Sequence, residues 1–298
     1  MTHEPHTDHY FHIGATHQRA GKPCQDYAYS ESDTRTAFAI VADGCSSGGN
    51  TDIGARLLAL TTASALRDIR DFRETLSPEI ASEYVRDRQK NIIDQTGIML
   101  DIGQDDLLAT CLYAFVGNGH ASILVQGDGV VAIRFRNGNI IAYRFEWDDN
   151  MPFYPAYRNG RLDRFVEAHG ADISAKRLTE DGWLLDGTGR WSPFFSPRRH
   201  SLREGMEGIR LEIGAEWFDE IEFVTLFTDG IAQIDGSDWK EAIETFLRFR
   251  SATGAFAKRR MMRGLEEIGK TGSFPQDDIA CAIIRMERKN ENETGGDS

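Results

Sequence analysis

Short apolar runs separated by turn residues dominate the chain and predict β-strands. Residues 27–30 and 36–42 form two such runs, joined by a polar turn. Four more runs with short glycine-containing turns between them predict a meander, at 110–116, 121–126, 130–136 and 139–145. The Asn137-Gly138 pair between the last two is a strong hairpin signal. Further strands are expected at 209–213, 222–227 and 279–286.

Longer segments with apolar residues at helical spacing predict four helices. Their ranges are 52–71, 78–98, 239–250 and 256–268. Thr51 is placed to cap the first helix, and Pro78 opens the second. Strands grouped together, with helices inserted in pairs, favour an α+β fold of antiparallel sheets covered by helices over a parallel doubly wound sheet.

Residues 146–203 break this periodicity and are rich in aromatic residues, proline, arginine and glycine. Two interpretations remain open for this segment: a flap that recognises substrate, or a small packed insertion. Because both ends of the chain are polar, we expect one domain over residues 10–287 with flexible tails at 1–9 and 288–298.

The charge and cysteine content narrow the possible functions. The 298 residues carry a formal net charge of −13, which disfavours nucleic acid and anionic membrane surfaces as partners. No apolar stretch approaches the roughly 20 residues of a membrane span, and no signal peptide is visible, so a cytoplasmic location is expected. Four scattered cysteines predict neither a disulfide framework nor a zinc site.

Aspartates stand at the ends of several predicted strands. Those that directly follow or precede an apolar run, or lie in the turn between two, are Asp26, Asp43, Asp128, Asp229, Asp277 and Asp278. If 27–30 pairs with 36–42, Asp26 and Asp43 lie opposite each other at one sheet edge. Asp-Gly pairs are also common turns. However, several carboxylates at one end of a β core repel one another unless a cation lies between them, and Mg²⁺ or Mn²⁺ prefers oxygen ligands.

The order of the motifs carries a family resemblance. They are CQDYA (24–28), VADGCSSG (41–48), TDIGA (51–55), LLATCLYAFV (107–116), QGDGVVAIR (126–134), LFTDGIA (226–232) and QDDIACAII (276–284). This series resembles the PPM or type-2C metal-dependent Ser/Thr protein phosphatases, in particular a divergent bacterial branch with a G-x-(S/T)-H motif before C-Q-D. The resemblance spans about residues 10–287. It implies a four-layer α-β-β-α sandwich with a metal site at one end of the two sheets.

The resemblance also implies a role for individual residues. Asp43 would bridge two metals, and Gly44 would offer its carbonyl to one of them. Asp229 and Asp277 resemble the other carboxylate ligands of the first metal, and Asp26 the acidic residue near the second. Asp128, with Asp229, resembles the ligands of a third, weaker metal. The implied cofactors are two Mn²⁺ or Mg²⁺ ions, with a possible third, which activate a water for hydrolysis without a protein nucleophile.

Three positions depart from the commoner family pattern. Gln25 stands where many members have Glu, and Cys45 where many eukaryotic members have His. The upstream phosphate-binding arginine is missing, so Lys22 or Arg19 becomes the candidate for that role.

The function expected from the resemblance is hydrolysis of phospho-Ser/Thr in phosphoproteins that a cognate Ser/Thr kinase modifies. One alternative is a catalytically weak regulatory module that binds phosphoprotein partners. Another is a metal-dependent hydrolase of a different phosphoester.

Overall fold

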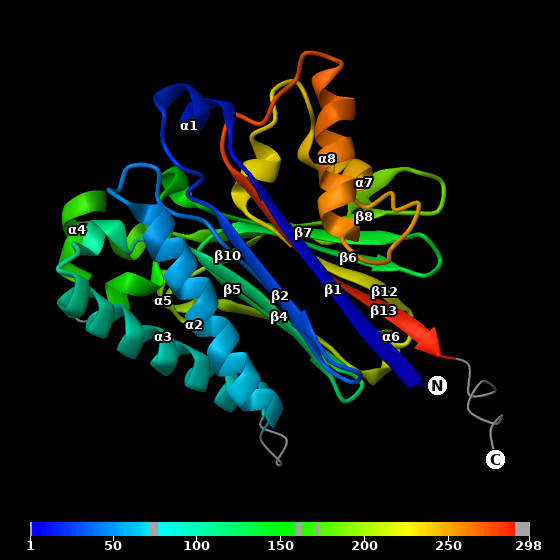
Figure 1. Cartoon of the computed structure of the whole chain (residues 1–298), viewed down its shortest axis with the longest axis horizontal. Coiled ribbons are helices and arrows are strands. Elements are labelled where there is room, and N and C mark those ends of the chain that lie inside the picture. The colour runs from blue at the N-terminus through cyan, green and yellow to red at the C-terminus, as the bar shows by residue number, and fades with distance from the viewer. Residues whose placement is uncertain (1, 72–76, 159–161, 171–172, 290–298) are drawn as a thin grey trace.

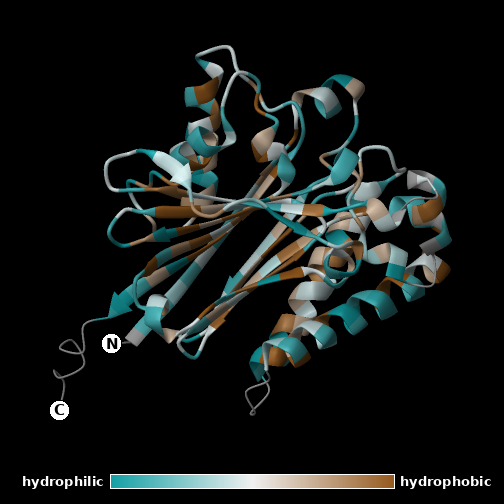
Figure 2. Ribbon diagram, turned by 180° about the vertical axis from the view of Figure 1, so that it is seen from behind, coloured by the Kyte–Doolittle hydropathy of each residue, from teal (hydrophilic) through white to brown (hydrophobic). Residues whose placement is uncertain are grey.

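Two antiparallel sheets lie face to face in the computed structural model, and helices cover the outer face of each (Figure 1). The structure describes residues 2–71, 77–158, 162–170 and 173–289. The four layers confirm the expected α-β-β-α sandwich. Figure 2 shows hydrophobic positions concentrated on the strands and the inward helix faces, with hydrophilic positions outside. No helix in the described ranges is both long and apolar enough to cross a membrane.

The larger sheet has eight strands. In spatial order these are β1 (Thr2–His12), β13 (Ile279–Lys289), β12 (Ile221–Phe227), β6 (Gly129–Phe135), β7 (Ile140–Trp147), β8 (Leu178–Leu185) and β10 (Arg198–His200), with β9 (Trp191–Pro193) paired to β8. The smaller sheet has the order β11 (Ile209–Ile213), β5 (His120–Gln126), β4 (Cys111–Gly117), β3 (Ala37–Ala42) and β2 (Tyr27–Ser32).

Two long helices, α2 (Thr51–Asp71) and α3 (Pro78–Leu100), cover the smaller sheet, while α7 (Trp239–Phe246) and α8 (Phe256–Gly269) cover the larger one (Figure 1). The short helices are α1 (Ala15–Ala20), α4 (Leu162–His169), α5 (Leu202–Glu207) and α6 (Ala215–Phe218). Single 3₁₀ turns occur at Gln104–Asp106, Asp148–Asn150, Pro155–Arg158, Ile173–Ala175 and Asp229–Ala232.

Burial on both faces explains the unbroken apolar runs of the central strands. All six residues of β3 are buried, because α2 packs on one face and the larger sheet on the other. A strand covered on both sides has no polar face, so its sequence does not alternate.

The predicted four-strand meander is wrong, because the chain changes sheet in the middle of it. Strands β4 and β5 form a hairpin in the smaller sheet, and β6 and β7 form one in the larger sheet. Asp128 lies at the crossing, between Gly127 with φ +105° and Gly129 with φ +135°. A Cβ on either glycine would lie under 3 Å from its neighbours, so this crossing requires both glycines.

The expected flexible tail over residues 1–9 is also wrong for residues 2–9, while residue 1 lies outside the described residues. Residues 2–12 pair with β13 along its whole length, so this polar segment is the edge strand of the larger sheet. Polar residues suit an edge strand, which is partly solvated, and they hide it from a search for apolar runs. At the other end β13 reaches Lys289, and residues 290–298 lie outside the described residues.

The segment 146–203 has two structural parts. Its second part corrects the expectation of an irregular insertion, because β8 pairs with β7 over eight positions and extends the larger sheet. The sequence of β8 does not show a strand pattern because a charged residue, Glu180, is at a buried position. Its carboxylate lies 2.7 Å from His200 Nε2 and 3.5 Å from Arg198 Nη1. The first part contains α4 and short turns, and it lies over the pocket described next.

Candidate metal centre

The two sheets bring their aspartates to one shared end. Tyr27 pairs with Ala42, so Asp26 and Asp43 lie beside each other before β2 and after β3, as predicted. In the larger sheet, Asp229 follows β12 and Asp277 precedes the neighbouring β13. The crossing between the sheets adds Asp128. One hairpin and three segments distant from it in the sequence therefore supply carboxylates to one end of the sandwich.

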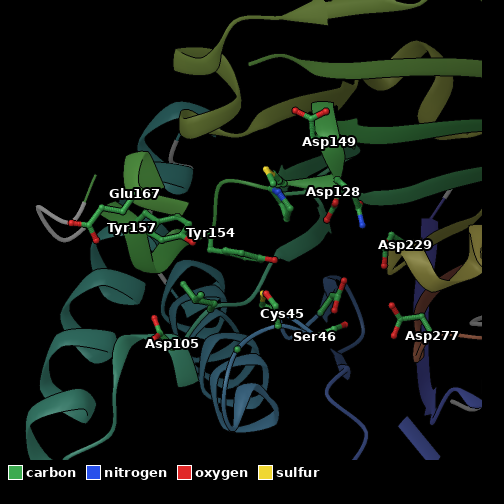
Figure 3. Close-up of a pocket in the computed structure, with 17 residues that line it drawn as sticks. Cys45, Ser46, Asp105, Asp128, Asp149, Tyr154, Tyr157, Glu167, Asp229 and Asp277 are labelled. Carbon is green, nitrogen blue, oxygen red and sulfur yellow. The ribbon is translucent and has the colours of Figure 1, made fainter. Parts of the chain in front are cut away.

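A cavity of about 910 Å³ opens at this end. Seven acidic residues line it, and four of them, Asp43, Asp128, Asp229 and Asp277, come from the strand ends and the crossing between the sheets. Figure 3 shows Asp229 and Asp277 on one side of the cavity, and Asp105, Tyr157 and Glu167 on the opposite side. The cavity therefore has an acidic wall, which both sheets build, and an opposite wall to which the segment after β7 contributes.

The carboxylates of the acidic wall disfavour one another's charged forms. Burial, followed by the neighbouring carboxylates, raises the pKa of Asp26, Asp43 and Asp128 well above the usual range. The pKa of Asp229 is raised by burial and by Asp277. The charges of Asp26, Asp128, Asp229 and Asp277 all act on Asp43, so Asp43 is the centre of the cluster.

Asp128 provides a direct test of whether this wall suits a cation. Its carboxyl is buried, and Oδ1 has no hydrogen-bond partner among the described residues. A buried carboxylate oxygen without a partner is costly, and a hard divalent cation with oxygen ligands would satisfy it. The donor set of the wall therefore fits Mg²⁺ or Mn²⁺.

Asp26 lies behind this wall rather than in it. Its side chain is 4% exposed and does not line the cavity. The Thr228 hydroxyl donates to Asp26 Oδ2 at 2.6 Å, and the Ala280 N–H donates to the Thr228 oxygen at 2.8 Å. Through Thr228, Asp26 ties the start of β2 in the smaller sheet to β12 and β13 in the larger one. Thr228 directly precedes Asp229, but its role was not evident from the sequence.

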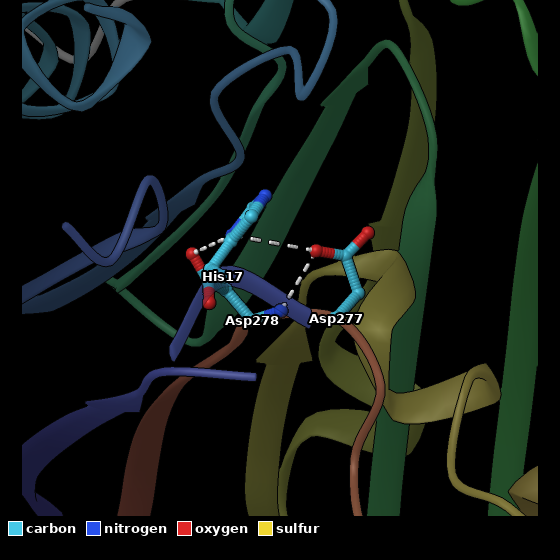
Figure 4. Close-up of side chains that lie close together, drawn as sticks. All are labelled: His17, Asp277 and Asp278. Atoms are coloured by element: carbon cyan, nitrogen blue, oxygen red, sulfur yellow. Dashed lines mark hydrogen bonds and ion pairs between the residues drawn. The ribbon is translucent and has the colours of Figure 1, made fainter. Parts of the chain in front are cut away.

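His17 and Asp278 form a second group next to Asp277 (Figure 4). His17 Nδ1 lies 2.9 Å from Asp278 Oδ2 and 3.9 Å from Asp277 Oδ1. Asp278 also accepts the N–H groups of Gly14 and Gln25, each at 2.6 Å. These contacts occupy both oxygens of Asp278, which fixes the loop before α1 and the segment before β2 against the start of β13. A Cβ on Gly14 would lie 2.2 Å from the Asp277 backbone, so only glycine fits this close approach.

The sequence profile of the protein phosphatase 2C family matches residues 13–268, which is most of the chain. This chain belongs to the protein phosphatase 2C family. Membership confirms the resemblance inferred from the motif order, and with it a function as a protein Ser/Thr phosphatase. No curated protein matches the chain in sequence.

Solved phosphatase structures share this fold at low sequence identity. The Mycobacterium tuberculosis phosphatase PstP/Ppp is 13% identical, with a TM-score of 0.54 over 96% of this chain and 100% of that chain. A structure of the PstP catalytic domain, in complex with two manganese ions, gives the same TM-score. Stp1 from Staphylococcus aureus is 12% identical, with a TM-score of 0.52 over 97% of each chain. A phosphatase 2C from Toxoplasma gondii is 14% identical, with a TM-score of 0.52 over 96% of this chain and 98% of that chain.

Of the positions that depart from the commoner family pattern, Gln25 lies outside the cavity lining and Cys45 belongs to it. Gln25 is buried and points to α2, where its Nε2 donates to Thr51 Oγ1 at 2.8 Å while its Oε1 has no partner among the described residues. Gly44 is buried, and its N–H donates to the Gln25 carbonyl. Cys45 lines the cavity, with Sγ 3.1 Å from Ser47 Oγ.

Neither predicted phosphate-binding residue lines the cavity. Lys22 Nζ donates to the carbonyl of Ser46, a cavity residue, at 3.1 Å, which places Lys22 at the rim. Arg19 is exposed on α1.

Arg144 on β7 is the cation that the sequence analysis missed. It lines a smaller cavity of about 120 Å³ together with Asp128 and Asp229. Its charge partly offsets the rise that burial and neighbouring acids cause in the pKa of both carboxyls. In the same cavity Gln233 Nε2 donates to Asp229 Oδ2 at 2.8 Å. Nothing in the local sequence singles out Arg144, since only the pairing of β6 with β7 sets it beside the Asp128 crossing.

Proposed function

We propose that this protein hydrolyses phosphoserine and phosphothreonine in protein substrates, with Mn²⁺ or Mg²⁺ held at the acidic wall. The observation that carries the proposal is the meeting of Asp43, Asp128, Asp229 and Asp277 in one cavity, where burial and neighbouring carboxylates raise the pKa values of the first three. Such a wall is stable in its charged form only when cations neutralise it.

Each residue of the acidic wall would have its own role in metal binding. Asp43 would bridge two ions from the centre of the cluster, assisted by the Gly44 carbonyl, and Asp229 and Asp277 would complete the first ion's ligands. Asp128 would share a possible third ion with Asp229, while Asp26 supports Asp43 from behind. When bound, divalent ions of this kind activate water and neutralise charge on phosphoryl oxygens.

Arg144 is our candidate for holding the phosphate group, because it lines the smaller cavity beside Asp128 and Asp229 and is about one-third exposed. Its Nη2 lies 3.0 Å from Glu146 Oε1, and a bound phosphate would compete with this exposed carboxylate for the guanidinium. A guanidinium can donate two parallel hydrogen bonds to a phosphate. Lys22 at the rim and Arg19 on α1 remain candidates for longer-range attraction of the phosphoprotein. The opposite wall, which includes Tyr154 and Met151, would contact the peptide around the phosphorylated side chain.

The experiment is a turnover assay with para-nitrophenyl phosphate and with a phosphoserine peptide. Each substrate is tested in EDTA, in Mn²⁺ and in Mg²⁺. We expect turnover of both substrates only with a divalent ion. Turnover of the aryl phosphate alone would point to a different phosphoester substrate, and binding of the peptide without turnover would support the regulatory-module alternative. Equal turnover in EDTA would overturn the metal assignment. A cognate kinase is expected, as in any phosphoprotein cycle, and phosphopeptide selectivity would help to identify it.

A further inference from the structure

A cluster of arginines surrounds a second cavity, of about 310 Å³, on the outer side of the larger sheet. The cavity lies between the loop that follows α7 and the first turns of α8, the helix pair at the upper right of Figure 1. Its lining has five arginines and no carboxylate: Arg248, Arg250, Arg259, Arg260 and Arg263. In a chain of net charge −13, this is a local reversal of sign.

The arginine cavity is separate from the acidic wall. Phe249 lines it and stacks on Phe223 of β12, with ring centroids 4.6 Å apart. Phe223 lies near the start of β12, whereas Asp229 follows its end. Arg134 fixes the loop at the same end, since its Nη1 donates to the Leu247 carbonyl at 2.5 Å. The two cavities therefore lie toward opposite ends of β12.

Much of the positive charge in this cavity is not neutralised by the protein. Arg248 pairs with Glu244, and Arg260 pairs with Glu267 at 2.5 Å. No ion pair among the described residues involves Arg250, Arg259 or Arg263. Arg259 donates to the neutral Thr253 carbonyl instead. At least three guanidinium groups therefore remain available to an anion.

Arg260 is the most informative of the five arginines. Its side chain is only 9% exposed, and Nε is buried without a hydrogen-bond partner among the described residues. A buried guanidinium nitrogen without an acceptor is costly, so a ligand oxygen at this position would be stabilising. The α8 N-terminus is not the source of the attraction, because Asp8 already accepts the N–H groups of Ala257 and Lys258.

We propose that this arginine cavity binds a phosphate group, and that a phosphorylated side chain fits it better than free phosphate does. Arginine donates paired hydrogen bonds to phosphate oxygens, which several guanidinium groups around one cavity can do together. The volume has room for about ten water-sized groups, more than the phosphorus and four oxygens of phosphate need. The remaining space, beside Phe249, would hold the group that carries the phosphate.

The test is fluorescence anisotropy with the full chain in EDTA and a dye-labelled peptide carrying one phosphoserine. In EDTA the acidic wall has no cations and repels phosphate, so binding reports on the arginines. Arg259→Ala/Arg263→Ala should weaken peptide binding at least about tenfold, since each removes a hydrogen bond to a charged group. The matched control, Lys258→Ala/Arg203→Ala, removes the same charge from exposed side chains outside the cavity and should change binding less than about twofold.

Competition identifies the source of the phosphate. If inorganic phosphate displaces the peptide only at far higher concentration than unlabelled phosphopeptide does, the ligand is a phosphorylated side chain. Displacement at equal concentration would support the phosphate site but overturn the preference for a side chain. Equal binding of the unphosphorylated peptide, or equal effects of the two double variants, would overturn the site. Metal-supported turnover of para-nitrophenyl phosphate should be unchanged in Arg259→Ala/Arg263→Ala, so this proposal and the proposed function fail independently.

Discussion

Replacing Asp43 by Asn should change metal-free stability and metal-supported activity in opposite directions. Asp43 lies at the centre of the acidic wall, where burial and then the charges of four other aspartates raise its pKa. Two carboxylates about 5 Å apart repel by roughly 3 kcal/mol at an effective dielectric constant near 20. Asp43 is partly exposed, so solvent screening reduces this repulsion, and we expect Asp43→Asn to stabilise the metal-free protein by about 1–2 kcal/mol.

With metal the same substitution should be damaging. Divalent cations supply several kcal/mol to water activation and charge neutralisation, so loss of the central ligand should lower kcat at least about a hundredfold. The assay is para-nitrophenyl phosphate turnover in Mn²⁺, together with thermal unfolding in EDTA and in Mn²⁺. Asp43→Asn should raise Tm by about 3 °C in EDTA and reduce the gain in Tm that Mn²⁺ produces.

The matched control is Glu167→Gln, which makes the same carboxylate-to-amide change on the opposite side of the cavity (Figure 3). It should leave both turnover and the Mn²⁺ effect close to those of the wild type. Wild-type turnover by Asp43→Asn, or an equal loss in Glu167→Gln, would refute the metal assignment. A lower Tm of Asp43→Asn in EDTA would refute the repulsion argument.

Four further predictions test other parts of the site. Arg144→Ala should lower kcat/KM for the aryl phosphate by about 10–100-fold, through loss of charged hydrogen bonds, and a larger loss in Lys22→Ala would move the phosphate-binding role to Lys22. Gln25→Glu adds a negative charge near Asp26, so a lower Mn²⁺ concentration should give half-maximal activity. The added charge is buried, so the substitution should also lower Tm in EDTA. An unchanged half-maximal Mn²⁺ concentration would show that position 25 does not affect metal binding. Because the pKa values of Asp26, Asp43 and Asp128 are raised, the native metal-free protein binds more protons than the unfolded chain above about pH 4. The free energy of unfolding should therefore fall as the pH rises from about 5.5 to 7.5, and saturating Mn²⁺ should oppose that fall. Chemical denaturation at both pH values, with and without Mn²⁺, measures this free energy. Met151→Ala should reduce kcat/KM for a phosphopeptide more than for the aryl phosphate, whereas equal losses would mean that this wall is only structural.

The sequence predicted the elements that are defined by patterns within their own segments. The β2–β3 hairpin, the helices α2 and α3 and the strand β11 follow from apolar runs, turn residues and helix starts close in the sequence. The hairpin register also placed Asp26 beside Asp43, because antiparallel pairing around a short turn leaves few alternatives. Helix α7 is shorter than the predicted helix 239–250 and ends at Phe246. The residues after it form a loop in which Phe249 packs on Phe223 of the larger sheet.

Elements stabilised by distant partners escaped the sequence analysis. Strand β1 is polar, and it is a strand because β13, from the other end of the chain, pairs with it. Strand β8 carries the buried Glu180, which is tolerated because Arg198 and His200 lie beside it. Neither arrangement leaves a local periodic signal, since the compensating groups belong to other elements.

The sequence by itself determined the family, the order of the strands that end in aspartate, and the residues that supply the acidic wall. Only the tertiary structure showed which of these aspartates reach the cavity: Asp43, Asp128, Asp229 and Asp277 line it, while Asp26 is buried behind it. It also decided which cations stand nearby, setting Arg144 beside Asp128 and leaving Arg19 exposed on α1. The physical reason is that residue type and spacing fix the chemistry a segment can offer, whereas electrostatics and burial depend on distances between segments, which exist only once the two sheets have packed.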